Sequence, residues 1–124
     1  MKFDLCIDVD DVERAVAFYG RGLGLTVIEQ HPDWAHVKVN DQTIWLMKIS
    51  AGPQGPITRD YRRHWTPVHL DLVIDEDLDT AVKRALDAGG KLDREIKRDA
   101  KGSRMASLSD PAGNGIDLVC RAGN

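Results

Sequence analysis

Apolar and polar positions follow two periodicities along the chain, and the same succession occurs twice. Residues 11–19 and 78–86 place apolar side chains at the i, i+3, i+4 and i+7 spacing of an amphipathic helix. Asp10 or Asp11 is suited to cap the first helix, Asp75-Glu76-Asp77 opens the second, and glycines follow both. The pattern therefore predicts two helices.

Strands are expected before and after each helix. Residues 2–9 and 69–73 alternate apolar with polar side chains, so each predicts a strand with one face packed beneath a helix. Three further strands are expected after each helix, and turn residues separate them. They cover residues 25–30, 34–39 and 43–49 in the first half, and 91–97, 103–109 and 115–121 in the second.

The resulting order is βαβββ, repeated once, which predicts an α+β fold in a single domain of residues 1–124. The first module covers about residues 1–50, a linker about 51–66 and the second module about 67–124. One βαβββ unit leaves a sheet face exposed, so we expect the two modules to pair about a pseudo-twofold axis. The expected result is a curved mixed sheet around a cleft that takes a small molecule.

Composition excludes several classes of partner. With 17 basic and 20 acidic residues the formal net charge is −3, which gives no general cationic surface for nucleic acid. No segment has the apolar length of a membrane span or the pattern of a signal peptide, so we expect a cytoplasmic protein without a membrane partner. The two cysteines, Cys6 and Cys120, are expected as reduced thiols.

Three segments carry a resemblance to a known superfamily. They are the helix Asp11–Tyr19 with the following Gly22-Leu23-Gly24-Leu25, the strand Val68–Val73, and Ser109-Asp110-Pro111-Ala112-Gly113-Asn114-Gly115-Ile116-Asp117-Leu118. Together they resemble the vicinal oxygen chelate superfamily, which includes glyoxalase I, extradiol dioxygenases, methylmalonyl-CoA epimerase and bleomycin-resistance proteins. The motifs are specific to the fold and much less so to one chemistry.

The resemblance implies a homodimer with metal ligands in the middle of four strands. The four ligand positions fall on Asp4, Trp45, His69 and Asp117. An indole cannot ligate a metal, because it offers only an N–H donor. The set that remains is Asp4, His69 and Asp117, which suits Fe(II), Mn(II), Ni(II) or Zn(II) and leaves coordination positions open for two substrate oxygens.

Two functions stay open on these residues. The first is a metal-dependent enzyme of glyoxalase or dioxygenase type, a lyase, isomerase or dioxygenase acting on a small molecule with vicinal oxygens. The second is a metal-free binding or antibiotic-resistance protein that stacks its ligand against Trp45. Cys6 and Asp71 share the polar strand faces and are expected to touch the ligand. A protein whose dimer surface matters more than its pocket is a third alternative.

The loop between the modules is rich in arginine. Arg59, Arg62 and Arg63 lie in a charged, aromatic segment that neither periodicity explains. They are suited to attract an anionic group of a substrate, although a solvated loop is the simpler interpretation. Ser107 and Ser109 lie on a predicted strand without a paired histidine in the sequence, so serine chemistry has little support.

Overall fold

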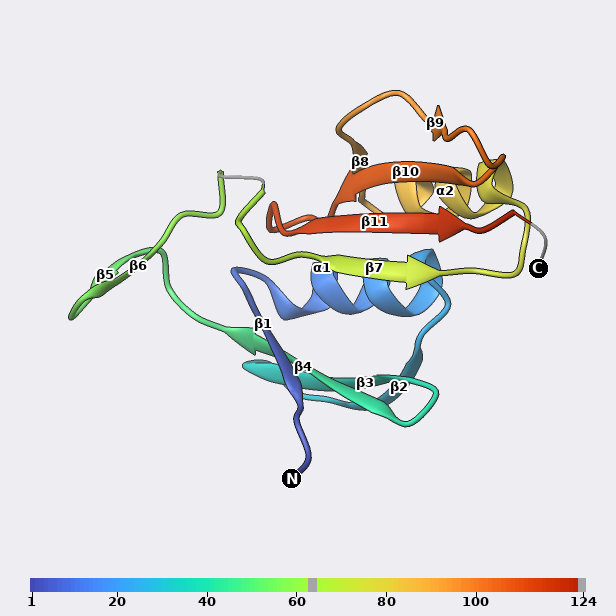
Figure 1. The fold of residues 1–124 in the computed structure, drawn as a ribbon. Coiled ribbons are helices and arrows are strands. Elements are labelled where there is room, and N and C mark those ends of the chain that lie inside the picture. Colours follow the sequence, from blue (N-terminus) through green and yellow to red (C-terminus); the bar gives the residue numbers. More distant parts are fainter. Residues whose placement is uncertain (63–64, 123–124) are drawn as a thin grey trace.

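The first module is a four-stranded sheet covered by one helical segment. The computed structural model describes residues 1–62 and 65–122 (Figure 1). The strand order is β1-β4-β3-β2, in which β1 runs parallel to β4 and the other neighbours are antiparallel. The elements are β1 (Leu5–Val9), α1 (Val12–Val16), η1 (Ala17–Gly22), β2 (Thr26–Gln30), β3 (Trp34–Val39) and β4 (Gln42–Lys48).

The second module repeats this topology. Its strand order is β7-β11-β10-β8. β7 runs parallel to β11, as β1 does to β4, and the other neighbours are antiparallel. β9 also pairs with β10. The predicted α+β class and the βαβββ repeat are thereby confirmed. The elements are β7 (Leu70–Val73), α2 (Leu78–Asp87), β8 (Lys91–Leu92), β9 (Lys97–Arg98), β10 (Arg104–Ser109) and β11 (Gly115–Cys120).

Two segments differ from the expected strands. The single strand predicted over residues 91–97 is wrong, because β8 and β9 are separated by residues 93–96. The Asp93 N–H still donates to the Ser107 carbonyl at 2.9 Å, so regular pairing with β10 stops after Asp93 and resumes at β9. The expected linker contains a short hairpin of β5 (Gly52–Gln54) and β6 (Ile57–Arg59).

Local side-chain chemistry sets the ends and the register of the helices. Asp11 caps α1 by accepting from the Arg14 N–H at 3.0 Å, and Asp77 caps α2 in the same way. After one turn α1 widens into the π-helical η1. The wider turn lets the adjacent residues Phe18 and Tyr19 both be fully buried, with ring planes perpendicular and centroids 5.1 Å apart.

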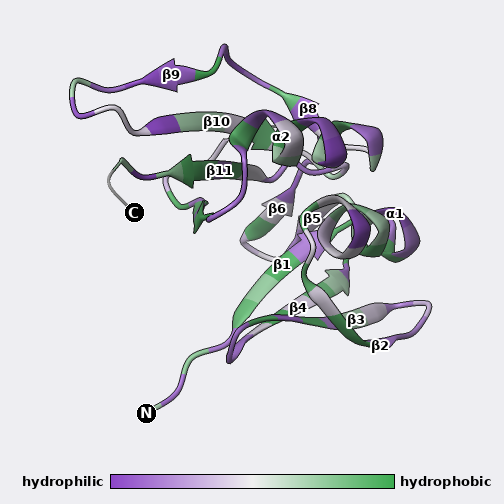
Figure 2. Cartoon of the chain, turned by 90° about the vertical axis from the view of Figure 1, so that its right-hand side faces the viewer, coloured by the Kyte–Doolittle hydropathy of each residue, from purple (hydrophilic) through white to green (hydrophobic). Residues whose placement is uncertain are grey.

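The helices join the two modules. Each helix packs against strands of its own sheet, and η1 also packs against α2 (Figure 2). Gly22 makes this approach possible, since a Cβ at that position would lie 2.9 Å from the Ala88 Cβ. The core is formed by apolar residues of both modules, among them Val37, Leu46, Leu108 and Ile116.

A buried polar cluster also links the modules. Tyr19 Oη donates to Asp110 Oδ2 at 2.6 Å, and the backbone N–H groups of Ala112 and Asn114 donate to Asp110 Oδ1. Asn114 Nδ2 donates to Asp110 and, at 3.0 Å, to the carbonyl oxygen of Asp8 on β1. Burial raises the pKa of both Asp110 and Tyr19. The hydrogen bonds from Tyr19 to Asp110 and from Asn114 to Asp8 thereby connect the turn between β10 and β11 to the first module.

The two sheets remain separate in the described chain. β1 and β7 each lie at the edge of their own sheet, and no ladder joins them. In Figure 1, β7 lies beside β11 in the upper module and β1 beside β4 in the lower one. Among the described residues, neither helix has the length and apolarity needed to cross a membrane.

Candidate functional site

One row of polar side chains crosses three strands of the second sheet. Asp71 on β7 is in register with Asp117 on β11, which is in register with Ser107 on β10. Ile116 and Leu118, the neighbours of Asp117, are buried in the core. Because side chains alternate along a strand, Asp117 points to the opposite face. The row therefore lies on the sheet face away from α2.

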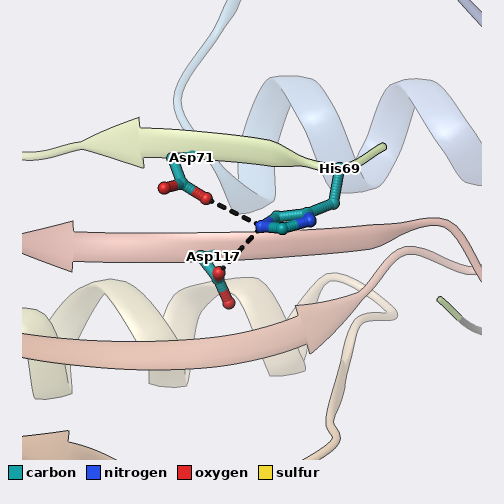
Figure 3. A group of neighbouring side chains, drawn as sticks. All are labelled: His69, Asp71 and Asp117. Carbon is teal, nitrogen blue, oxygen red and sulfur yellow. Dashed lines mark ion pairs between the residues drawn. The ribbon is translucent and has the colours of Figure 1, made fainter. Parts of the chain in front are cut away.

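His69 completes a compact group with this row. Its Nε2 lies 3.1 Å from Asp71 Oδ1 and 3.2 Å from Asp117 Oδ2 (Figure 3). The Asp117 side chain is 7% exposed, whereas those of His69 and Asp71 are 36% and 58% exposed. Asp117 is thus the buried carboxylate of the group, and the group is open to solvent on the side of Asp71.

The donor set fits a divalent metal ion. Its three ligand atoms, one imidazole nitrogen and two carboxylate oxygens, all lie within 4.8 Å of one another. The His69 Nε2 lies beside one oxygen of each carboxylate. An imidazole nitrogen with two carboxylate oxygens is a donor set that first-row divalent metals accept. His69, Asp71 and Asp117 would therefore be the residues that hold such an ion.

A second set of side chains supports this group. Ser107 Oγ donates to Asp117 Oδ1 at 2.7 Å and accepts from Arg94 Nη2 at 3.1 Å. The Trp65 ring meets the His69 ring edge to face at 5.1 Å. The Trp65 Nε1–H donates to Asp93 at 2.9 Å.

The sequence pattern does not indicate these supporting roles. It offers Ser107 only as a weak candidate nucleophile and singles out neither Arg94 nor Asp93. The signal that points to Ser107 is its register opposite Asp117, which requires the β10–β11 pairing.

The first module places different chemistry at the same positions. Cys6 on β1 is in register with Trp45 on β4, which is in register with His36 on β3. By the repeated topology these three positions correspond to Asp71, Asp117 and Ser107. The polar row of the second sheet is thus replaced by a row that contains two aromatic rings.

Asp4 and Trp45 are partners of each other. The Trp45 Nε1–H donates to Asp4 Oδ2 at 2.9 Å, and its ring stacks on His36 at a centroid distance of 4.5 Å. Trp34 meets Trp45 at 5.8 Å and His31 at 4.3 Å, so the aromatic surface continues across the sheet. In the described chain, Asp4 is not part of the group formed by His69, Asp71 and Asp117.

A cavity of about 360 Å³ lies at the junction of the modules, where a cleft was expected. Cys6 and Asp8 of β1 line one side, and His69 lies on another. Arg59 reaches in from the hairpin and pairs with Asp8. Partial burial, together with the negative charge of Asp8, raises the pKa of the Cys6 thiol, so this side chain is a neutral wall group and not an activated nucleophile.

The arginines expected to attract an anionic group already have partners. Arg59 is engaged by Asp8, and Arg62 makes two hydrogen bonds to Asp60. Arg63 lies outside the described residues.

The match to a family model covers almost the whole chain, since residues 4–119 fit the model described as a glyoxalase-like domain. The chain belongs to the glyoxalase-like domain family. This result confirms the resemblance to the vicinal oxygen chelate superfamily. No curated protein matches the chain.

Solved structures of glyoxalase-like proteins share the fold. A glyoxalase-related enzyme from Fulvimarina pelagi superposes with a TM-score of 0.76 at 17% identity, over 98% of this chain and 89% of that one. A glyoxalase/bleomycin resistance protein/dioxygenase from Alicyclobacillus acidocaldarius gives 0.68 at 18% identity, over 98% and 92%. Lactoylglutathione lyase from Agrobacterium tumefaciens gives 0.66 at 20% identity, over 97% and 92%. At these identities the likeness concerns the fold.

Proposed function

We propose that this glyoxalase-like protein is a metal-dependent enzyme of glyoxalase or dioxygenase type acting on a small molecule with two neighbouring oxygens. The observation that carries the proposal is the group of His69, Asp71 and Asp117, which fits a divalent ion of the Fe, Mn, Ni or Zn kind. An ion bound there supplies Lewis-acid stabilisation of negative charge on the substrate oxygens.

The residues of the group have different roles in this proposal. Asp117 is buried and held by Ser107, so it forms the fixed part of the site. His69 lies between the two carboxylates, and its ring is positioned by the edge-to-face contact with the Trp65 ring. Asp71 is the most exposed member, so it lies on the side of the group from which a substrate would approach. The adjoining cavity, which His69 also lines, would receive the body of the molecule.

Metal analysis tests the proposal directly. Protein purified without a nickel column is expected to hold about one divalent ion per chain, or to take up one in titrations with Mn(II), Fe(II), Ni(II) or Zn(II). His69→Ala should abolish the uptake. His31→Ala is the matched control, because His31 also lies beside a carboxylate, that of Glu29 at 2.8 Å. An ion that never reaches stoichiometric amounts, or that is retained in His69→Ala, would refute the proposal.

The aromatic surface of the first sheet favours a second candidate function. Trp45 stacks on His36, contacts Trp34 and holds the carboxylate of Asp4 at its edge. Such a surface suits a planar cationic ligand in a metal-free binding protein. Quenching of tryptophan fluorescence by an aromatic cation, lost in Trp45→Phe and kept in Trp65→Phe, together with absence of metal, would favour this function.

The same proposal includes assembly as a cytoplasmic homodimer. Its support is that β1 and β7 both present unpaired edges, which natural proteins usually cover. Sedimentation equilibrium should give twice the mass of 13.8 kDa. A single-chain mass at micromolar concentration would contradict it.

A further inference from the structure

Arg94 lies at the rim of the candidate metal group. It follows β8, in the segment that departs from the predicted strand. Its Nη2 donates to Ser107 Oγ, and that hydroxyl donates to Asp117 Oδ1. The guanidinium is thus two hydrogen bonds away from the buried carboxylate of the group.

Trp65 holds Arg94 from a second direction. The guanidinium carbon lies 5.8 Å from the centroid of the indole ring, within the range of a cation–π contact. The ring itself is fixed by its hydrogen bond to Asp93 and by its contact with His69. It also lies directly on Gly115, where a Cβ would approach it to 2.6 Å. Trp65 therefore contacts both His69 and Arg94, and it positions Arg94 near the candidate metal group.

The charge of Arg94 is not neutralised by the described part of the chain. Arg59, Arg84 and Arg104 each form an ion pair with a carboxylate there, but no described carboxylate lies within 4.0 Å of Arg94. The neighbouring Asp93 accepts from Trp65 with one oxygen and from Ser109 with the other. A guanidinium has five N–H donors, and Ser107 takes one of those of Arg94. The remaining donors are available to a ligand.

From this arrangement we infer that Arg94 binds an anionic group of the ligand, so that the molecule taken by this site carries a carboxylate or similar planar anion beside its two oxygens. The inference rests on the proposed function. The two carboxylates of Asp71 and Asp117 balance a divalent ion, and Arg94 adds a positive charge next to them. The fork of a guanidinium matches the two oxygens of a carboxylate, which a lysine does not.

A matched pair of ligands tests the inference. The probes are 3,4-dihydroxybenzoate and its methyl ester, which share the two vicinal oxygens and differ in the anionic group. Binding to the Mn(II)-loaded protein is measured by isothermal titration, and the metal content of each sample is determined alongside. The wild-type protein should bind the acid at least about tenfold more tightly than the ester, as expected for a charge-assisted contact.

Variants connect the preference to Arg94. Arg94→Gln, compared with the wild type at saturating Mn(II), should lower the ratio of acid affinity to ester affinity to about one, and Arg94→Lys should restore part of that ratio. Arg98→Gln is the control, because Arg98 is an exposed arginine on the adjacent β9. A wild-type protein that binds the acid no better than the ester overturns the inference. So does a preference that persists in Arg94→Gln.

The two proposals fail separately in this experiment. Stoichiometric metal without an Arg94-dependent preference overturns the role of Arg94 alone. Absence of metal overturns the proposed function, and an Arg94-dependent preference for the acid under that condition still supports the anion site.

Discussion

The indole nitrogen of Trp45 donates a hydrogen bond to Asp4 Oδ2 at 2.9 Å. This pair occupies the positions that hold Asp117 and His69 in the second module, because Cys6 pairs with Trp45 as Asp71 pairs with Asp117. The two modules therefore use one backbone arrangement for two kinds of surface. One module presents one imidazole and two carboxylates, and the other presents stacked rings.

The comparison predicts which carboxylates matter for metal affinity. Asp71→Ala should weaken metal binding by roughly tenfold or more, because it removes one of three ligand atoms. Asp4→Ala should change the affinity by less than about twofold, since Asp4 is engaged by Trp45 on the other sheet. Competition titrations against a chromogenic chelator measure both. An equal loss in Asp4→Ala would return Asp4 to the ligand set.

Ser107 is expected to act on the metal through Asp117. Ser107→Ala removes the donor that fixes Asp117 Oδ1, and loss of such a supporting contact typically costs roughly 10-fold to 100-fold in metal affinity. Ser109→Ala is the control, because Ser109 lies on the same strand and donates to Asp93 instead. The same chelator competition distinguishes the two variants. Similar affinities for both would show that the hydrogen bond to Asp117 does not tune the site.

The contact between Tyr19 and Asp110 should stabilise the pairing of the modules. Tyr19→Phe removes a fully buried donor and is expected to lower the free energy of unfolding by about 1–3 kcal/mol. Tyr61→Phe is a matched change at a half-buried tyrosine that donates to the Ile49 carbonyl, and it should cost less, about 0.5–1.5 kcal/mol. Urea unfolding provides both values, and the reverse order would contradict the assignment.

Asp110 should make stability depend on pH in an unusual direction. Burial raises the pKa of this carboxyl in the folded state, even though hydrogen bonds from Tyr19 and Asn114 lower it. The folded chain therefore binds the proton more tightly than the unfolded chain, whose pKa is about 3.9. The stabilisation of the folded state by this tighter proton binding is fully present below the unfolded pKa, and it is lost as pH rises through the folded pKa.

The measurement compares the wild-type protein with Asp110→Asn. The free energy of unfolding of the wild type, minus that of the variant, should fall between pH 3.5 and 7, by about 1.4 kcal/mol for each unit by which the folded pKa is raised. Other titrating groups are common to both chains and cancel. A difference that grows with pH would mean that the hydrogen bonds outweigh the burial of Asp110.

The indole ring of Trp65 leaves no room for a side chain at position 115, so we expect stability to depend on the glycine there. Gly115→Ala would bring a Cβ to 2.6 Å from the ring, so the ring must move, at a cost of about 1–3 kcal/mol in stability. Because the three atoms nearest to such a Cβ all belong to Trp65, Gly115→Ala should cost much less in a Trp65→Ala background. Urea unfolding of the four proteins of this cycle measures the coupling. Equal costs in both backgrounds would refute it.

The hydrophobic pattern predicts the two helices, most of the strands and the repeat. The i, i+3, i+4 spacing of residues 78–86 predicted α2, and the alternation of residues 69–73 predicted β7, because both depend on neighbours in the sequence. The pattern predicts the segment 91–97 as one strand, because the break between β8 and β9 depends on their separate pairing with β10, which is distant in sequence. The same limit applies to Ser107, whose role depends on its register opposite Asp117.

The amino-acid sequence by itself determined the α+β class and the two modules, since these follow from local periodicity, whereas the candidates His69 and Asp117 came from the resemblance to the vicinal oxygen chelate superfamily. The tertiary structure alone decided that Asp71 joins His69 and Asp117, that Asp4 bonds to Trp45, and that Arg94 lies beside the group with Trp65. The physical reason is that strand register and packing bring together residues far apart in the chain, and these depend on the folding of the whole molecule.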